Sequence, residues 1–480
     1  MDTRSAVEIA DGVKAGDISP VALVDETLAR IEKRNDRTNA YITVIEEHAR
    51  EAAERAERAA EAGEDLGPLH GVPLALKDLH AHKSGVRTTF GAKPFADHVA
   101  DADAIITERL EAAGAIVLGK TNTPEFGHKP RTDNKLVGAT GTPFAPDRIA
   151  GGSSGGSAAA LADGLATIAT GSDVGGSLRV PASCCHVASV KPSFGLVPNG
   201  SGVDTFSSHT PTGVMGPIAR TIEDLAVMLD VMVGQDDRDP FSVPTDGGYH
   251  ETLETATTDV SLAYANDLGG LFTIEDVVTE QVESALAAVE DAGATVETVG
   301  VDGPSKGDLN HAFSLQATAK FATLAQNVER EFGIDLAGEH ADDVSSSLLA
   351  TIALGEGHEA VEYNAQNVVR TAMYDAVEDA IGDHDALVCP TLAVPPFPLE
   401  ADNPTEIAGE PANGTLTDWS LPWVFNVTGH PVVSVPAGVT DDGLPVGLQL
   451  VGHRYTEAEL LATARAFERA NPWLDAYPDS

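Results

Sequence analysis

Two glycine-rich turns constrain the fold of this chain more than any other feature. They span Gly151–Ser157 and Asp173–Ser177, and they are joined by an alanine-rich segment, Ala158–Ala162, and a short apolar run, Leu165–Ala169. This pattern predicts a turn, a helix, a strand and a second turn. Glycine lets the backbone adopt positive φ and approach a bound group closely. Successive N–H groups in such turns form an anion-binding concavity, and a serine among them is suited to attack a carbonyl whose oxyanion they bind.

Glycine-rich turns alone also fit a phosphate cradle or a flexible loop. A Walker-type loop requires Gly-Lys followed by Ser or Thr, and neither of these two turns contains such a triplet. A low-complexity linker would not be followed by apolar helix and strand patterns. Neither turn contains the Gly-x-Ser-x-Gly elbow of an α/β-hydrolase, so a Ser-His-Asp triad has no local support. A serine nucleophile that needs another base is the interpretation that remains.

Three motifs, taken in order, carry a resemblance to a known family. They are GVPLALKD at 71–78, GGSSGGSAAA at 151–160 and GSDVGGSLR at 171–179. Together they closely resemble the amidase signature family of serine hydrolases, in which catalysis rests on a Ser–cis-Ser–Lys triad. The resemblance implies that Lys77 is the base, that Ser153 lies in a cis peptide after glycine, and that Ser177 is the nucleophile.

The resemblance also implies a mechanism. Neutral Lys77 takes a proton through Ser153 from Ser177, which attacks the amide carbonyl. The relay then protonates the leaving amine, and water hydrolyses the acyl-enzyme. The oxyanion is expected to be held by the backbone N–H groups of Val174, Gly175, Gly176 and Ser177. Many members of the family have Thr at the position of Val174, but only the backbone of this residue is required.

The residues around the triad have more than one interpretation. Burial at the end of an apolar strand would depress the pKa of Lys77, whereas the sequence pattern by itself also fits an exposed lysine at a strand end. Ser154 is expected to support the network. Asp173 and Arg179 flank the nucleophile and are expected to pair and hold the turn; the alternative for Arg179 is to bind a substrate carboxylate.

The rest of the chain is typical of a large α/β protein. We expect a single α/β/α domain with a central mixed, mostly parallel sheet covered by helices on both faces, which the resemblance also implies. Loops then gather at the carboxyl ends of strands, where open α/β sheets bind ligands. Four regions are expected: a helical arm at 1–62, a catalytic core at 63–235, a variable helical region of the substrate pocket at 255–385, and core strands with a closing helix at 386–480.

Local signals predict the bounds of several elements. Ser19-Pro20 is typical of a helix start, and a third helix is expected from Val44 to Ala62, so that residues 1–62 are interpreted as helical. The run Leu69–Lys77 predicts the first core strand, and Glu457–Ala470 predicts the last helix.

The charge of the chain is unusual. The sequence has 74 acidic and 30 basic residues, for a net charge of −44. Because the acidic residues are spread along the chain, we favour adaptation to high salt, as in a halophile, over a docking surface for a basic partner. The same charge argues against direct binding of nucleic acid, which requires clustered Lys and Arg.

The sequence favours a cytoplasmic protein without a cofactor. It shows no signal-peptide core and no apolar run long enough to cross a membrane. Three cysteines do not form a disulfide framework. His80 and His82 suggest a metal site, but no spaced set of partners accompanies them. We therefore expect no metal, no cofactor and no membrane partner.

Three functions are compared. The favoured one is an amidase that hydrolyses a small-molecule carboxamide to a carboxylic acid and ammonia or an amine. The alternative is the A subunit of a glutamyl/aspartyl-tRNA amidotransferase, which passes ammonia from glutamine to a partner subunit; the stretch Val424–Pro431 resembles general amidases more closely. A non-catalytic protein with an acidic docking face is disfavoured because all three triad residues are present. The acyl and amine groups, esterase activity and a homodimer stay open.

Overall fold

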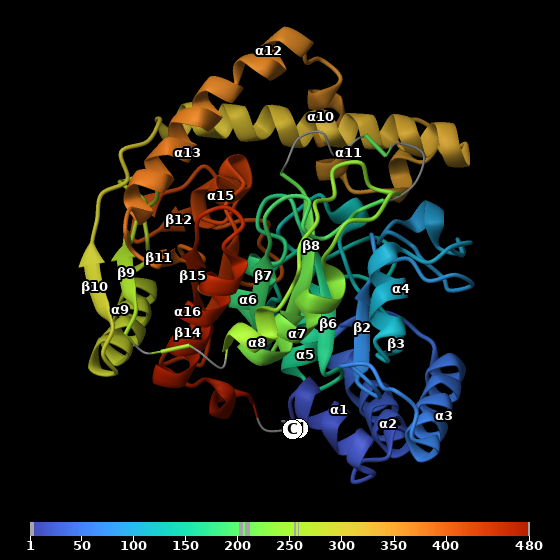
Figure 1. Cartoon of the computed structure of the whole chain (residues 1–480). Coiled ribbons are helices and arrows are strands. Elements are labelled where there is room, and N and C mark those ends of the chain that lie inside the picture. Colours follow the sequence, from blue (N-terminus) through green and yellow to red (C-terminus); the bar gives the residue numbers. More distant parts are fainter. Residues whose placement is uncertain (1–3, 201–204, 207–211, 254–255, 258, 479–480) are drawn as a thin grey trace.

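A sheet of 11 strands forms the centre of the computed structural model, which describes residues 4–200, 205–206, 212–253, 256–257 and 259–478 (Figure 1). Along the sheet the strands follow the order β1-β3-β2-β6-β8-β7-β14-β15-β11-β9-β10. Their bounds are β1 (Tyr41–Val44), β2 (Pro73–Lys77), β3 (Ile116–Thr121), β6 (Ile168–Asp173), β7 (Ala188–Lys191), β8 (Val214–Ala219), β9 (Ser261–Tyr264), β10 (Thr295–Thr298), β11 (Ala386–Pro390), β14 (Val432–Val439) and β15 (Pro445–Val451). Two small hairpins lie outside this sheet, β4 (Gly141–Thr142) with β5 (Ala145–Ile149) and β12 (Glu406–Ile407) with β13 (Glu410–Pro411).

The strand directions confirm a mixed sheet and correct the expectation that it is mostly parallel. Among the described strands, the parallel neighbours are β3-β2-β6 on one side and β11-β9-β10 on the other. The pairs between these groups, and the edge pair of β1 with β3, are antiparallel. Short connections such as the turn between β14 and β15 can only join antiparallel neighbours, because a parallel pair needs a long crossover.

Helices cover both faces of the sheet, as expected. One apolar core contains buried residues of α2, α3, α5, α6, α13 and α15, and the other contains those of α1, α4, α7, α9 and α16. Strand residues alternate between the two cores: on β2, Ala75 belongs to the first, and Leu74 and Leu76 belong to the second. The chain is therefore a single α/β domain with three layers.

The helices vary from single turns to the long α10, which crosses one end of the sheet in Figure 1. Their bounds are α1 (Ala6–Ala15), α2 (Pro20–Thr38), α3 (Glu46–Ala62), α4 (Ile105–Ala112), α5 (Gly155–Ala162), α6 (Arg179–Cys185), α7 (Ile222–Met232), α8 (Tyr249–Thr252), α9 (Asp276–Asp291), α10 (Lys306–Phe332), α11 (Ser346–Gly355), α12 (Ala360–Ala365), α13 (Asn367–Ile381), α14 (Leu416–Trp419), α15 (Trp423–Thr428) and α16 (Glu457–Ala470).

The structure confirms some predicted element bounds and corrects others. Helix α2 begins at Pro20 with the Ser19 side chain as its cap, and α16 has the predicted bounds. The interpretation of residues 1–62 as wholly helical is wrong. Residues 41–44 form β1, an edge strand of the main sheet, and α3 begins at Glu46. The β-rich segment Tyr-Ile-Thr-Val finds hydrogen-bonding partners on β3, which a local pattern cannot reveal.

The expected site lies at one end of the sheet. Lys77 is the last residue of β2, and the second glycine turn follows β6, a parallel neighbour of β2. Carboxyl ends of parallel strands meet at the same edge. Within the described residues, no helix combines the length and apolar character needed to span a bilayer.

Candidate active site

Lys77 is buried and surrounded by hydroxyl groups. Only 2% of the residue is exposed to solvent. Lys77 Nζ donates hydrogen bonds to Ser153 Oγ over 2.7 Å and to Ser172 Oγ over 2.9 Å. Burial lowers the pKa of Lys77 to about 7, although the charge of Asp173 acts in the opposite direction. A substantial share of this amine is therefore neutral near pH 7 and can accept a proton.

The two serine-bearing turns adjoin each other. The peptide bond between Gly152 and Ser153 is cis, as expected from the resemblance. The Ser154 N–H, in the peptide after Ser153, donates to the Ser177 carbonyl over 3.2 Å. Ser177 is half-buried, and its hydroxyl has no hydrogen-bond partner among the described residues. The structure thus links Lys77 to Ser153 directly, and it places Ser177 beside them with an unengaged hydroxyl.

The loop after β3 covers the cis serine. A Cβ atom built on Gly127 would lie 3.1 Å from Ser153 Oγ and 2.9 Å from a methyl group of Leu79. Gly127 also has a φ of +72°, which side-chain-bearing residues rarely adopt. A glycine is therefore needed where this loop approaches the site.

The predicted pair of Asp173 and Arg179 is confirmed. Both residues are fully buried, and Arg179 Nε lies 3.0 Å from Asp173 Oδ2. Burial by itself would raise the pKa of Asp173. The Arg179 guanidinium, Asn426 and the Gly176 N–H stabilise the carboxylate and lower the pKa to about 2. The carboxylate also accepts from the Leu178 N–H over 3.1 Å, so it ties together the turn that presents Ser177.

The structure corrects one part of the predicted oxyanion site. The Gly176 N–H donates to Asp173 Oδ1 over 2.7 Å, so it is already engaged. The N–H groups of Val174, Gly175 and Ser177 make no hydrogen bond within the described part of the chain. Three of the four predicted donors stay available, and the fourth serves to shape the turn.

Sequence reasoning missed three polar residues at this site. Ser172 bonds Lys77, as described above. Asn426 donates to Asp173 Oδ1 over 2.8 Å and accepts from Arg179 over 2.7 Å. Gln449 accepts from Arg179 over 3.1 Å. Ser172 lies in the GSDVGGSLR motif and could have been found there. Asn426 and Gln449 lie far away in the sequence, where only their polarity inside apolar segments gave a signal.

The turn that carries Ser177 is bordered by apolar side chains. A Cβ atom on Gly175 would meet the Phe313 ring at 2.8 Å and a methyl group of Leu416 at 3.9 Å. A Cβ atom on Gly176 would meet Pro422 at 2.9 Å. Phe313 lies on α10, so this helix forms one wall beside the turn.

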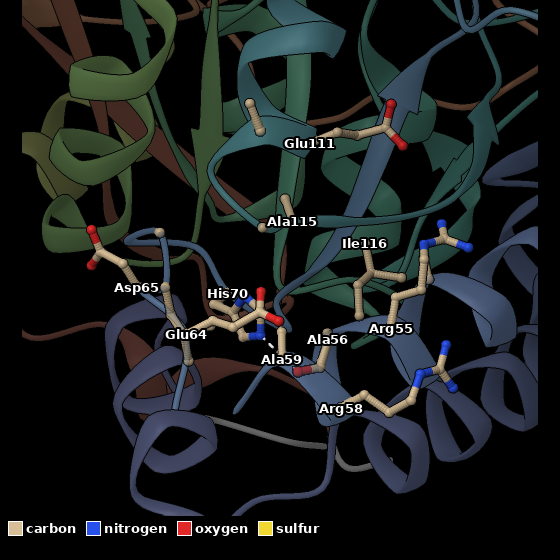
Figure 2. A pocket seen from close by; sticks show the side chains of 15 residues that line it. Arg55, Ala56, Arg58, Ala59, Glu64, Asp65, His70, Glu111, Ala115 and Ile116 are labelled. Atoms are coloured by element: carbon tan, nitrogen blue, oxygen red, sulfur yellow. Dashed lines mark hydrogen bonds between the residues drawn. The ribbon is translucent and has the colours of Figure 1, made fainter. Parts of the chain in front are cut away.

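A separate surface hollow lies at the other end of the sheet. Its volume is about 480 Å³. Figure 2 shows side chains that line it, among them Arg55 and Arg58 of α3, Glu111 of α4 and Ile116 at the start of β3. None of the predicted site residues lines it. Ile116 pairs with Pro73, at the opposite end of β2 from Lys77. This hollow is therefore separate from the surroundings of Lys77.

Within the described ranges, no group of three or more His, Cys, Asp or Glu side chains could hold a metal ion. The groups capable of chemistry among the residues described above are a partly neutral amine, the hydroxyls of Ser153, Ser172 and Ser177, and free backbone donors.

The chain is similar to known proteins over nearly its whole length. The sequence model of the family described as Amidase matches residues 22–461. The chain is 36% identical to an acylamidase of Rhodococcus erythropolis, over 99% of this chain and 97% of that protein. It is also 36% identical to the A subunit of the glutamyl-tRNA(Gln) amidotransferase of Halorhodospira halophila, over 100% and 99% of the two chains. The crystal structure of a bacterial aryl acylamidase of the amidase signature family superimposes with a TM-score of 0.93 at 33% identity, covering 99% of this chain and 97% of the other.

Proposed function

This chain belongs to the amidase signature family of amide-hydrolysing enzymes, and on that premise we propose that it cleaves a small-molecule carboxamide through an acyl-enzyme on Ser177. The products are a carboxylic acid and ammonia or an amine. The similarity to an acylamidase and to an aryl acylamidase supports N-acyl amines as the substrate class.

In the proposed reaction Ser177 Oγ attacks the carbonyl carbon as its proton passes to Ser153, whose own proton passes to neutral Lys77. The N–H groups of Val174, Gly175 and Ser177 bind the oxyanion, a role in which one donor commonly contributes about 3 kcal/mol. Collapse of the intermediate breaks the C–N bond, and the Lys77 proton returns through Ser153 to the leaving nitrogen. Water then attacks the ester by the same relay and releases the acid.

One observation carries the proposal. Lys77 Nζ lies 2.7 Å from Ser153 Oγ inside the protein, and burial lowers the pKa of this lysine to about 7. An exposed structural lysine would stay protonated and could not act as a base. Asp173 and Arg179 hold the turn and Ser154 supports it; their many internal bonds leave Arg179 no free donor role towards a substrate carboxylate.

The test is a panel of simple aliphatic and aryl amides together with a serine-directed fluorophosphonate. We expect hydrolysis of at least one N-acyl amine and labelling of Ser177. The Ser177→Ala variant should lose both labelling and turnover while retaining its circular dichroism spectrum. Ser183→Ala is a matched control, because this buried serine on α6 lies outside the triad. Unchanged turnover in Ser177→Ala would refute the mechanism.

The second candidate is the A subunit of a glutamyl/aspartyl-tRNA amidotransferase. The chain is 36% identical to such a subunit over its whole length, which equals its identity to the acylamidase. Copurification with a larger partner, and ammonia release from glutamine that depends on this partner, would support this second candidate. Cleavage of simple N-acyl amines by the isolated chain, without glutaminase activity, would support the amidase.

A further inference from the structure

Lys320 is a cation without a counter-charge at the edge of the active site. No described carboxylate pairs with it, although the chain has 74 acidic residues against 30 basic ones. A Cβ atom built on Gly213 would lie 2.9 Å from Lys320 Nζ and 3.3 Å from a methyl group of Val174. The amine therefore lies close to the turn that carries Ser177.

The same face of α10 presents two further groups to this region. Phe313 precedes Lys320 by two helical turns, and its ring lies against Gly175, as described above. Gln316 lies between them, one turn from each. It is only 5% exposed, and its buried Oε1 has no hydrogen-bond partner in the described structure. Buried amides are normally hydrogen-bonded, so an unpaired one on this face points to a ligand. Oε1 is an acceptor and would take an N–H of that ligand, whereas the NH2 group of Gln316 is the part that can donate to an anion.

The charge of Lys320 also acts on His80. This histidine follows β2 three residues after Lys77, and its ring has no hydrogen-bond partner among the described residues. Burial, and then the charge of Lys320, keep the pKa of His80 well below its usual value. The imidazole is neutral there and can donate one N–H.

Lys320 is exposed to solvent, although the protein atoms around its amine lower its pKa. A ligand can therefore reach this amine. An anion bound there would offset the desolvation cost of the ammonium.

We propose that Lys320 Nζ and the NH2 group of Gln316 bind a carboxylate of the substrate, so that the preferred amides carry a negatively charged group. This inference rests on the proposed amidase function and adds the substrate class. One ammonium with neutral N–H donors matches a single negative charge. The apolar wall around Phe313 would hold the carbon skeleton between that carboxylate and the amide bond.

The test compares matched amides with and without a carboxylate. On the acyl side the pair is glutaryl-4-nitroanilide and pentanoyl-4-nitroanilide; on the amine side it is 4-acetamidobenzoate and 4-methylacetanilide. For at least one pair, we expect kcat/KM of the native enzyme to be at least tenfold higher for the carboxylate. Lys320→Met should lower that value by roughly 10- to 100-fold, the worth of one hydrogen bond to a charged group. It should change kcat/KM for the neutral amide by less than about threefold.

Lys33→Met is the matched control, because it removes the same charge from an exposed position on α2. It should leave both values unchanged at the same KCl concentration. Gln316→Leu should lower kcat/KM selectively for the carboxylate substrate, mainly by raising KM.

The two proposals fail differently. The carboxylate subsite is overturned if neutral amides are cleaved but neither carboxylate is preferred, or if Lys320→Met lowers kcat/KM equally for both members of a pair. Either result leaves the proposed amidase function intact. If no amide is cleaved, the proposed function fails. The subsite is then tested by calorimetry with 4-acetamidobenzoate, which should bind the native chain at least tenfold more tightly than Lys320→Met. Equal binding would overturn it.

Discussion

Lys77 Nζ donates a hydrogen bond to Ser153 Oγ over 2.7 Å, although the two residues are 76 positions apart. The partners of this amine are hydroxyl groups; no carboxylate of the described structure is bonded to it. An amine that is buried among neutral acceptors holds its proton weakly. This contact connects the last residue of β2 with the turn that precedes α5. Substitutions at either residue can therefore test its role.

The first prediction concerns pH. Because the pKa of Lys77 is about 7 and its neutral amine is the proposed base, kcat/KM should rise with pH through about 7 and then level off. Well below pH 7 it should fall by about tenfold per pH unit. A pH–rate profile with a neutral amide measures this rise. In Lys77→Met the rise should disappear, and activity should fall by about 10²- to 10⁴-fold. A flat profile in the native enzyme would remove Lys77 as the base.

A second prediction concerns Ser172, a positioning residue. Its hydroxyl accepts from Lys77 over 2.9 Å, and such a bond is stronger with the ammonium than with the neutral amine. Ser172→Ala should therefore lower the pKa of Lys77 further and shift the acid limb of kcat/KM to lower pH. Ser189→Ala, a buried serine on β7, is the control. A loss of activity without any shift of the limb would indicate a role in packing alone.

The third prediction concerns the buried pair. Asp173→Asn leaves the Arg179 charge buried without its partner, so the free energy of unfolding should fall by about 3–5 kcal/mol. The double variant Asp173→Asn, Arg179→Met should be less destabilised than the sum of the two single variants. Urea unfolding of all four proteins measures this coupling, and additive effects would show that the pair does not act as a unit.

The same carboxylate gives a pH dependence of stability. Its pKa of about 2 in the fold is below the usual value of 3.8, so the stabilisation is present above about pH 4 and is lost as pH falls towards 2. The slope of unfolding free energy against pH in this window should be smaller for Asp173→Asn than for the native chain.

A fourth prediction separates two adjacent glycines. In Gly175→Ala the new methyl group meets the Phe313 ring at 2.8 Å, and overpacking of this kind costs about 1–3 kcal/mol. Adding Phe313→Ala should restore the space and part of the activity. Gly176 has a φ of +111° and faces Pro422, so Gly176→Ala should not be rescued by Phe313→Ala. Thermal unfolding and kcat/KM of the four variants decide this, and rescue of both would contradict it.

A fifth prediction follows from the net charge of −44. Self-repulsion should destabilise the fold in dilute buffer, and molar salt, with a Debye length of about 3 Å, should screen it. The free energy of unfolding should therefore rise between 0.1 M and 2 M KCl. Choline chloride at equal ionic strength should act similarly, because screening does not depend on the cation. Stability that is independent of salt would argue against salt adaptation.

Much of the site could be predicted because its signals are local. The glycine turns, the end of the β2 strand at Lys77 and the first turn of α5 each lie within one continuous motif, and the resemblance assigned roles to them. The Ser19-Pro20 cap and the apolar period of α16 likewise depend on neighbours a few positions away. By contrast, local patterns misassign β1 to a helical region, because its partner strand β3 lies far along the chain.

The sequence by itself determined the family, the alternation of strands and helices, and which lysine and serines the proposed chemistry uses. Only the tertiary structure decided the strand directions, the engagement of the Gly176 N–H by Asp173, the support from Asn426 and Gln449, and the position of Lys320 near the turn that carries Ser177. The physical reason is range. Turns, caps and periodicity act between residues a few positions apart, whereas these contacts join segments that meet only after the sheet has assembled and buried both of its faces.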